Sequence, residues 1–279
     1  MSIQEIVNIL TEAGVEPNEA NVEVRMLLEH FANYGAKDII MGNKLTEEKL
    51  QIVKEKALLR AKTRQPIQHI IGFANFMGVD FIVNPSVLIP RDETEILVRK
   101  AVEIINQNGF KMALDVGTGS GCIACMIAKY TDCQIIGLDV STDALNTALD
   151  NASRLNLFNK AIFRKSDVFS NVKPREMFDV IVSNPPYIPL TQKIDIQKEV
   201  QFDPELALYT KDEKGLEFYE RICEGAPAIL NKGGYLLFEI GINQAQDVKN
   251  IMVKNGFADI EIIKDLAGIE RVIVAKIKN

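Results

Sequence analysis

The stretch Asp115-Val116-Gly117-Thr118-Gly119-Ser120-Gly121 says most about the fold of this chain. It overlaps the end of an apolar run, residues 112–116, that has the length and composition of a buried strand. A helix is expected to begin just after it, near Cys122. Glycines at such a junction let the backbone pass close to a ligand at the carboxyl edge of a parallel sheet. The glycine loop (residues 115–121) therefore predicts an α/β fold with a binding site at that edge.

Outward from this loop, six further apolar runs have the length of strands, and helical spacing separates most of them. They are residues 134–138, 161–163, 178–182, 235–240, 260–263 and 272–277. This alternation predicts a doubly wound, mainly parallel sheet of about seven strands. Only Asp265-Leu266-Ala267-Gly268 separates the last two runs, which is too short for a parallel crossover. We therefore expect the last strand to be antiparallel.

The N-terminal part has a different pattern. Residues 3–10, 24–31 and 50–58 carry apolar residues at helical spacing, Thr46 stands where an N-cap would, and Gly35 can close the second helix. Between Phe73 and Val83 the period changes to two, with Gly78 at the turn. We expect a helical bundle over residues 1–68, a β-hairpin linker over residues 69–87 and the α/β domain over residues 88–279.

Composition and charge restrict the class of protein. The chain has 279 residues, 47% hydrophobic and 25% charged, with a formal net charge of −6, which is normal for a globular protein and argues against a broad nucleic-acid surface. The N-terminus shows no signal peptide and no apolar run reaches membrane-spanning length, so a cytoplasmic location without a membrane is expected. Cys122 and Cys125 form a single C-x-x-C without a second pair or a nearby histidine, so no metal site is expected.

The spacing of the glycines indicates the kind of cofactor. A dinucleotide fingerprint needs G-x-G-x-x-G, whereas here Gly117, Gly119 and Gly121 follow G-x-G-x-G, which suits a nucleoside cofactor without a pyrophosphate. Asp139 ends the next strand, where a carboxylate can accept hydrogen bonds from both ribose hydroxyls. Asp167 and Val168 follow the third strand, where an adenine ring would lie. Surface or helix-capping roles remain open for both acids.

Asn184-Pro185-Pro186-Tyr187 follows the strand at residues 178–182, on the same edge as the glycine loop. Two prolines terminate a strand, but they do not explain the asparagine and the tyrosine beside them. An amide-type nitrogen is a poor nucleophile, so catalysis must position it. The Asn184 oxygen and the Pro185 carbonyl can accept its two N–H groups, and Tyr187 can pack against its plane. The residues alone leave glutamine, adenine and guanine open as substrates of an S-adenosylmethionine-dependent methyltransferase.

Several segments resemble the HemK/PrmC family, the peptide chain release factor glutamine methyltransferases, essentially from end to end. The motifs are residues 65–72, Val87-Leu88-Ile89-Pro90-Arg91-Asp92-Glu93-Thr94-Glu95, residues 115–124, residues 184–188, Phe202-Asp203-Pro204-Glu205 with Ala207-Leu208, Gly233-Gly234 with Glu239-Ile240-Gly241, and residues 265–268. Asn-Pro-Pro-Tyr is shared with nucleic-acid methyltransferases, whereas the Ile-Pro-Arg-x-Glu-Thr-Glu segment is more discriminating.

The resemblance implies a helical domain that helps to recognise the release factor and a seven-stranded Rossmann-like methyltransferase domain. It implies methyl transfer from S-adenosylmethionine to the glutamine side-chain nitrogen of the Gly-Gly-Gln loop, with release factors as partners, no direct nucleic-acid partner and a monomeric enzyme. Carried over by position, the cofactor residues are Gly117, Thr118, Gly119, Ser120, Gly121, Asp139, Asp167, Val168 and Asn184. The substrate residues are Leu88, Asn184, Pro185, Pro186 and Tyr187, and the catalytic ones are Asn184, Pro185 and Tyr187.

Two positions depart from the family pattern. Asp92 replaces a usual proline, and an acid is acceptable at a helix start. Lys211-Asp212-Glu213-Lys214-Gly215 replaces a more compact turn, so the geometry of that loop is open. Three other functions are compatible with parts of this pattern: a nucleic-acid methyltransferase, an NAD-binding oxidoreductase and a catalytically silent binding module. The glycine spacing argues against the second, and the acidic balance against the first.

Overall fold

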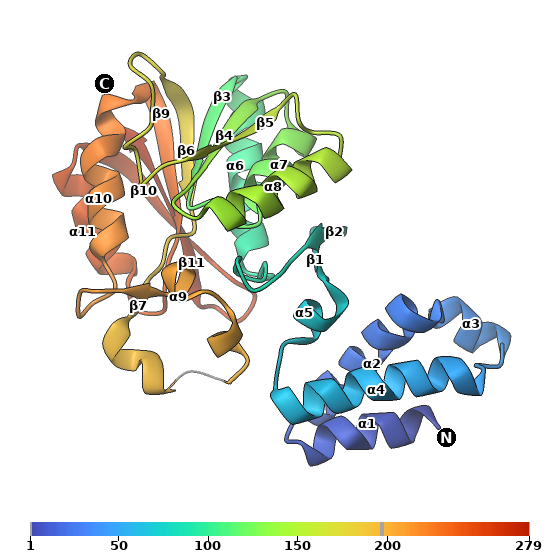
Figure 1. Cartoon of the computed structure of the whole chain (residues 1–279). Coiled ribbons are helices and arrows are strands. Elements are labelled where there is room, and N and C mark those ends of the chain that lie inside the picture. Colours follow the sequence, from blue (N-terminus) through green and yellow to red (C-terminus); the bar gives the residue numbers. More distant parts are fainter. Residues whose placement is uncertain (1, 196–197, 279) are drawn as a thin grey trace. The chain divides into compact units, whose positions relative to one another are not determined.

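The computed structural model describes residues 2–195 and 198–278 (Figure 1). The chain forms two compact units. A helical unit contains residues 2–72 together with residues 198–202. An α/β unit contains residues 73–195 and 203–278, and it is called the catalytic unit below because the residues predicted to be catalytic lie in it. None of the helices in the described residues is long and apolar enough to cross a membrane.

The helical unit contains five helices: α1 (Ile3–Glu12), α2 (Pro17–Ala32), α3 (Ala36–Met41), α4 (Glu47–Thr63) and α5 (Ile67–Ile71). The expected apolar stripes pack together as its core, and Thr46 caps α4 by accepting from the Lys49 amide. The prediction that Gly35 closes the second helix is wrong. That helix ends at Ala32 with Asn33 in the left-handed region, and Gly35 is the N-cap of α3, which is too short to show a period.

Within the helical unit, Arg60 is the largest fully buried side chain, only 1% exposed. Its Nη2 lies 2.9 Å from Oε1 of Glu23, and its Nη1 lies 3.0 Å from Oε1 of Glu199. Arg64 also contacts Glu199. Residues 198–202, which include the short 3-10 helix η2 (Val200–Phe202), therefore belong to the helical unit through a buried ion-pair cluster, although they are far from it in sequence.

The catalytic unit is built on a seven-stranded sheet in the order β10-β11-β9-β6-β3-β4-β5. The strands are β3 (Met112–Val116), β4 (Gln134–Asp139), β5 (Ala161–Lys165), β6 (Phe178–Ser183), β9 (Leu230–Glu239), β10 (Phe257–Lys264) and β11 (Glu270–Ile277). The five strands other than β10 and β11 pair in parallel, and β11 runs antiparallel to both neighbours. The mainly parallel sheet with an antiparallel last strand is thus confirmed.

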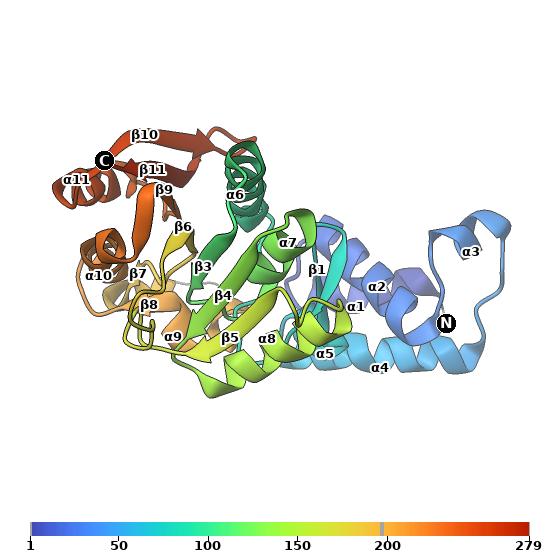
Figure 2. The same cartoon turned by 90° about the horizontal axis from the view of Figure 1, so that it is seen from above.

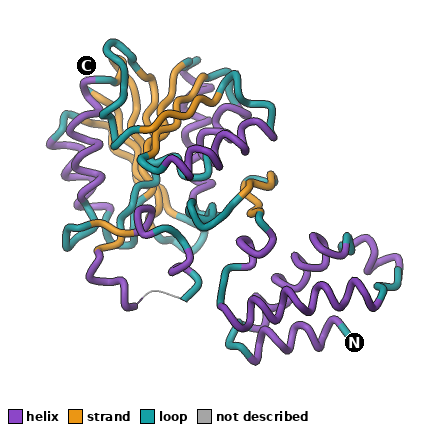
Figure 3. Tube along the Cα trace, viewed as in Figure 1, coloured by secondary structure: helices purple, strands orange, loops and turns teal. Residues whose placement is uncertain are grey.

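Helices cover both faces of this sheet (Figures 2 and 3). On one face α6 (Thr94–Asn108), α7 (Cys122–Tyr130) and α8 (Thr142–Arg154) bury one core cluster. On the other, α10 (Glu217–Gly225) and α11 (Ala245–Lys254) bury a second. Smaller elements complete the unit: α9 (Glu205–Leu208), η1 (Leu190–Asp195), η3 (Ala226–Ala228) and the parallel pair β7 (Ile188–Pro189) and β8 (Tyr209–Thr210).

The expected hairpin is present as β1 (Phe73–Phe76) paired antiparallel with β2 (Val79–Ile82). It clusters with the catalytic unit. Asn151 of α8 holds it, since its Oδ1 accepts from the Ile82 amide over 2.7 Å and its Nδ2 donates to the Ile82 carbonyl over 3.0 Å. The same Nδ2 donates to the Ser120 carbonyl, so one buried amide joins the hairpin to the glycine loop.

Candidate active site

The glycine loop connects β3 to α7 with backbone angles that favour glycine. Gly117, Gly119 and Gly121 have φ of 76°, 54° and 77°. A Cβ at Gly121 would lie 2.9 Å from the Ala148 Cβ, so this glycine allows α7 and α8 to approach. A Cβ at Gly117 or Gly119 would meet nothing within 4 Å, because the space beside them is open. These two glycines therefore leave room for a ligand.

The side chains of Thr118 and Ser120 are buried instead of facing that space. The Thr118 hydroxyl donates to Asp115 Oδ2 over 2.6 Å. Burial raises the pKa of Asp115 to about 7. Among the described residues, the loop thus presents mainly its glycine backbone to the cavity, and Thr118 and Ser120 shape it from behind.

Asp139 ends β4 beside the loop, as the sequence predicts. Its Oδ2 accepts from the Gly119 amide and its Oδ1 from the Ser141 amide, each over 2.9 Å. Burial raises the pKa of this carboxyl, and the backbone amides of Ser141 and Gly119 oppose the shift. Each oxygen keeps a lone pair for a further donor, such as a ribose hydroxyl.

Asp167 and Val168 lie just past the end of β5, and both line the cavity. Arg221 of α10 donates to Asp167 Oδ1 over 2.7 Å. Val168 has φ of 48°, a backbone conformation that β-branched residues rarely adopt. Strain of this kind at a cavity wall is typical of a binding site.

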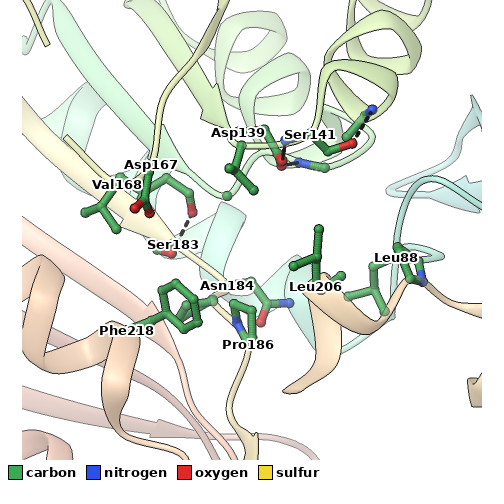
Figure 4. Close-up of a pocket in the computed structure, with 18 of the residues that line it drawn as sticks. Leu88, Asp139, Ser141, Asp167, Val168, Ser183, Asn184, Pro186, Leu206 and Phe218 are labelled. Carbon is green, nitrogen blue, oxygen red and sulfur yellow. Dashed lines mark hydrogen bonds between the residues drawn. The ribbon is translucent and has the colours of Figure 1, made fainter. Parts of the chain in front are cut away.

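The Asn-Pro-Pro-Tyr segment begins where β6 ends at Ser183, whose hydroxyl donates to the Val116 carbonyl over 2.6 Å. Asn184 Nδ2 donates to Thr94 Oγ1 over 3.3 Å. Asn184, Pro185 and Pro186 line the cavity. Figure 4 shows Asn184, Asp139 and Leu88 around one opening.

Tyr187 lies differently from its two proline neighbours. Its side chain packs against the core cluster under α10 and α11, and among the described residues it is absent from the cavity wall. Gln244 Nε2 donates to the Tyr187 carbonyl over 3.0 Å, and a Cβ at Gly215 would lie 2.0 Å from the same oxygen. The loop at residues 211–215, whose geometry the sequence left open, therefore lies directly against the Asn-Pro-Pro-Tyr segment.

Leu88 reaches the cavity from the segment between the hairpin and α6. Asp203, only 3% exposed, accepts from Arg91 Nη2 over 2.7 Å and from the Ile89 amide over 3.4 Å. Val87 and Ile89 pack with Ala144 in a small apolar cluster. Two sequence motifs far apart in the chain thus fix the position of Leu88.

These groups enclose one cavity of about 380 Å³, a volume within the range of small-molecule sites, which is roughly 300–1,000 Å³. Its wall includes the open space beside Gly117 and Gly119, the Asp139 carboxylate and the Asn184 amide. Such an arrangement can hold a nucleoside on one side and a planar amide on the other.

Several residues of the site region received no role from the sequence, among them Thr94, Glu239 and Gln244. Glu239 ends β9 with 4% exposure and accepts from Thr94 Oγ1 over 2.5 Å. Thr94 and Glu239 stand inside quoted motifs, so the signal was available. The sequence did not show that these two residues are hydrogen-bonded to each other, because residues 145 positions apart are brought together only by the fold.

Residues 2–72 match the PrmC N-terminal domain family, and residues 92–201 match the methyltransferase small domain family. The release factor glutamine methyltransferase of Geobacter sulfurreducens is 37% identical over 276 residues, covering 96% of this chain and 93% of that protein. The protein of the same name from Neisseria gonorrhoeae is 36% identical over 258 residues, covering 91% and 93%.

Among solved structures, a methyltransferase from Pyrococcus furiosus is similar with a TM-score of 0.54 and 20% identity, covering 83% of this chain and 98% of that chain. At this identity the likeness shows the fold alone.

Proposed function

The chain belongs to the family of release factor glutamine methyltransferases, and we propose that its cavity is where a release-factor glutamine meets the methyl donor S-adenosylmethionine. The enzyme methylates glutamine in peptide chain release factors. The observation that carries the assignment of the site is the Asn184 carboxamide, which opens into the same cavity as Asp139 and the glycine loop. We also propose a cytoplasmic location, because translation supplies the release-factor substrate.

The cavity fits this donor on grounds of its own residues. Gly117 and Gly119 leave open space that side chains would fill, and Asp139 offers carboxylate lone pairs suited to ribose hydroxyls. Asp167 and Val168 wall the region assigned to the base. When bound, S-adenosylmethionine supplies an electrophilic methyl group on a sulfonium.

The protein's own contribution is to orient the nitrogen. Asn184 Oδ1 accepts one N–H of the substrate amide and the Pro185 carbonyl accepts the other, which places the nitrogen lone pair toward the donor side. Both acceptors also stabilise positive charge as it develops on the nitrogen. No strong base is required, since the proton can leave after methyl transfer. Tyr187 serves this site by holding the segment from the core side.

Leu88 and Leu206 form the apolar wall on the substrate side of the cavity (Figure 4). Leu206 is 71% exposed, so it stands at the mouth. We assign the substrate glutamine of the Gly-Gly-Gln loop to the space between these leucines and Asn184. The helical unit is assigned to recognising the body of the release factor.

The test is incubation of the full chain with methyl-labelled S-adenosylmethionine and a purified release factor, followed by mass spectrometry of the loop peptide. We expect one methyl group on the glutamine side chain. Asn184→Ala should lower the rate by about a hundredfold or more, as removal of a comparable transition-state contact does. Parallel reactions contain total RNA or DNA, and label entering only nucleic acid would refute the proposal.

A further inference from the structure

Glu239 lies behind the catalytic segment, out of the cavity wall as far as the described residues show. Its carboxylate is 4% exposed and its Oε2 lies 2.5 Å from Thr94 Oγ1. Thr94, the first residue of α6, is 3% exposed and its Oγ1 lies 3.3 Å from Asn184 Nδ2. Three side chains from the end of β9, the start of α6 and the end of β6 thus form one buried chain of hydrogen bonds.

The chemistry of the three groups fixes the direction of this chain. An ionised carboxylate can only accept, so the single Thr94 proton points to Glu239. The Thr94 oxygen then has only lone pairs left, and it can bind only the nitrogen end of the Asn184 amide. The oxygen end of that amide is consequently the one available to the cavity.

We propose that Glu239 and Thr94 are positioning residues for catalysis, which hold the Asn184 carboxamide in the single orientation that accepts the substrate N–H. This inference rests on the proposed function. An asparagine amide without such a partner can rotate by half a turn and present its NH₂ to the substrate nitrogen, which would place two donors face to face. The relay (Glu239, Thr94 and Asn184) removes that non-productive state.

The burial of Glu239 argues for this role over a merely structural one. A buried carboxylate costs free energy that a neutral side chain of the same shape avoids. Hydrogen bonds from the Thr94 hydroxyl and the Asn184 amide lower the pKa of Glu239, but burial outweighs them. Arg271 is the favourable charge, Glu93 opposes it, and Tyr187 and Tyr219 face the same residue. The Tyr219 hydroxyl donates to the Glu239 main-chain carbonyl over 3.1 Å, not to the carboxylate. The relay requires a group that only accepts hydrogen bonds, whereas packing alone does not require one.

The test compares Thr94→Val with Thr94→Ser in the full-length enzyme, using the release factor and S-adenosylmethionine. Valine keeps the shape and removes the hydroxyl, so kcat should fall by about ten- to hundredfold, the scale of a displaced catalytic group. The dissociation constant of S-adenosylmethionine should change little, whereas the melting temperature should fall by a few degrees, because the buried Glu239 carboxylate loses a hydrogen-bond donor. Serine restores the hydroxyl and should restore most of kcat. Thr131→Val, which removes another buried threonine hydroxyl, remote from the cavity, is the matched control.

Glu239→Gln provides a second measurement that does not depend on the folding of the valine variant. Glutamine can turn either its oxygen or its nitrogen to Thr94, so the Asn184 amide loses its single orientation and kcat should fall by about three- to tenfold. If both Thr94→Val and Glu239→Gln methylate within twofold of the wild type, the relay has no positioning role. A wild-type enzyme that leaves the release factor unmethylated would instead overturn the proposed function.

Discussion

At the scale of single residues, the site works through hydrogen bonds whose partners leave little freedom. Asp139 is held by two backbone amides, Asn184 by Thr94, and Thr94 by Glu239. Each of these groups is fixed before any ligand arrives, so the binding free energy is not spent on ordering them. The consequence is that small chemical changes at these positions should separate binding of the donor from the chemical step.

Asp139→Ala should weaken binding of S-adenosylmethionine by about tenfold or more, because hydrogen bonds to a charged group are each worth about 1.5–3 kcal/mol. Calorimetric titration measures the dissociation constant. Asp139→Asn keeps one acceptor oxygen, so its dissociation constant should lie between those of the wild type and the alanine variant. An alanine variant that binds as tightly as the wild type would remove Asp139 from the cofactor site.

Glu239 predicts a pH dependence with a definite sign. Burial raises its pKa to about 7. Below that pH the protonated carboxyl can donate to Thr94 and reverse the relay, so kcat should fall as the pH drops from 8 to 6. Asp115 also has a pKa raised by burial to about 7, so the profile of Glu239→Gln is needed to separate the two. If the relay is the cause, that variant loses the fall in kcat.

Stability should respond in the opposite sense. A folded-state pKa above the unfolded value of 4.5 means that Glu239 stabilises the protein most at pH below 4.5, and that this contribution is lost as the pH rises through about 7. At pH 8 the free energy of unfolding of Glu239→Gln should therefore exceed that of the wild type by on the order of 2 kcal/mol. The difference should be smaller at pH 5. Thermal melts at both pH values measure it.

At the scale of elements, loops without regular structure hold the catalytic segment. Gln244, beside α11, donates to the carbonyls of Tyr187, Lys214 and Gly215. Asp212 accepts from the amides of Leu216 and Glu217 and shapes the turn into α10. The departure at residues 211–215 is thus a hydrogen-bonded turn that supports the Asn-Pro-Pro-Tyr segment.

Gly215→Ala should disrupt this contact. The added Cβ would lie 2.0 Å from the Tyr187 carbonyl oxygen, so the catalytic segment must shift and kcat should fall by about a hundredfold. Gly256→Ala is the matched control, because its φ of 89° imposes similar backbone strain while nothing lies within 4 Å of its Cβ. An equal loss of kcat in the two variants would show that backbone strain, and not the contact with Tyr187, causes the effect.

The segment that carries Leu88 depends on a long-range ion pair. Arg91→Gln removes the charged partner of the buried Asp203 carboxylate, and the Ile89 amide alone then has to satisfy it. The Arg91 side chain is 40% exposed but Asp203 is buried, so the loss of the charged partner should lower the free energy of unfolding by about 1–3 kcal/mol. Steady-state kinetics should show a KM for the release factor raised about fivefold or more, with the dissociation constant of S-adenosylmethionine unchanged; a change confined to the latter would contradict this assignment.

At the scale of the whole molecule, the chain leaves the catalytic unit after η1 and returns to it at Asp203. Between these points residues 198–202 belong to the helical unit, through the ion pairs of Glu199 with Arg60 and Arg64. Residues 198–202, which come after β7 and η1 in the chain, are therefore part of the unit that we propose recognises the release factor.

Arg60→Ala should loosen the helical unit selectively. Breaking a buried ion pair by removing one partner costs about 3–5 kcal/mol, because the remaining charge is left unpaired. Hydrogen exchange should accelerate in α2, α4 and residues 198–202, while β3 and β4 keep their protection. Arg99→Ala removes an exposed pair in which Arg99 is 65% exposed, and it should change little. A uniform loss of protection would contradict two separately stable units.

The sequence alone determined the order of the main strands and helices, the antiparallel last strand and the edge of the sheet at which the cavity lies. These follow from local patterns: apolar runs, crossover lengths and glycines at a strand–helix junction. It also located part of the cavity wall, including Gly117, Gly119, Asp139 and Asn184, because the carboxyl ends of parallel strands meet at one edge.

Only the tertiary structure decided which buried groups stand behind the cavity wall. The pairing of Glu239 with Thr94, the clamp of Asp203 on Arg91 and the turning of Tyr187 into the core join positions that no local period relates. The physical reason is that hydrogen-bond partners and side-chain direction depend on where distant elements pack. Asn184 was visible in the sequence, but the orientation of its amide was not.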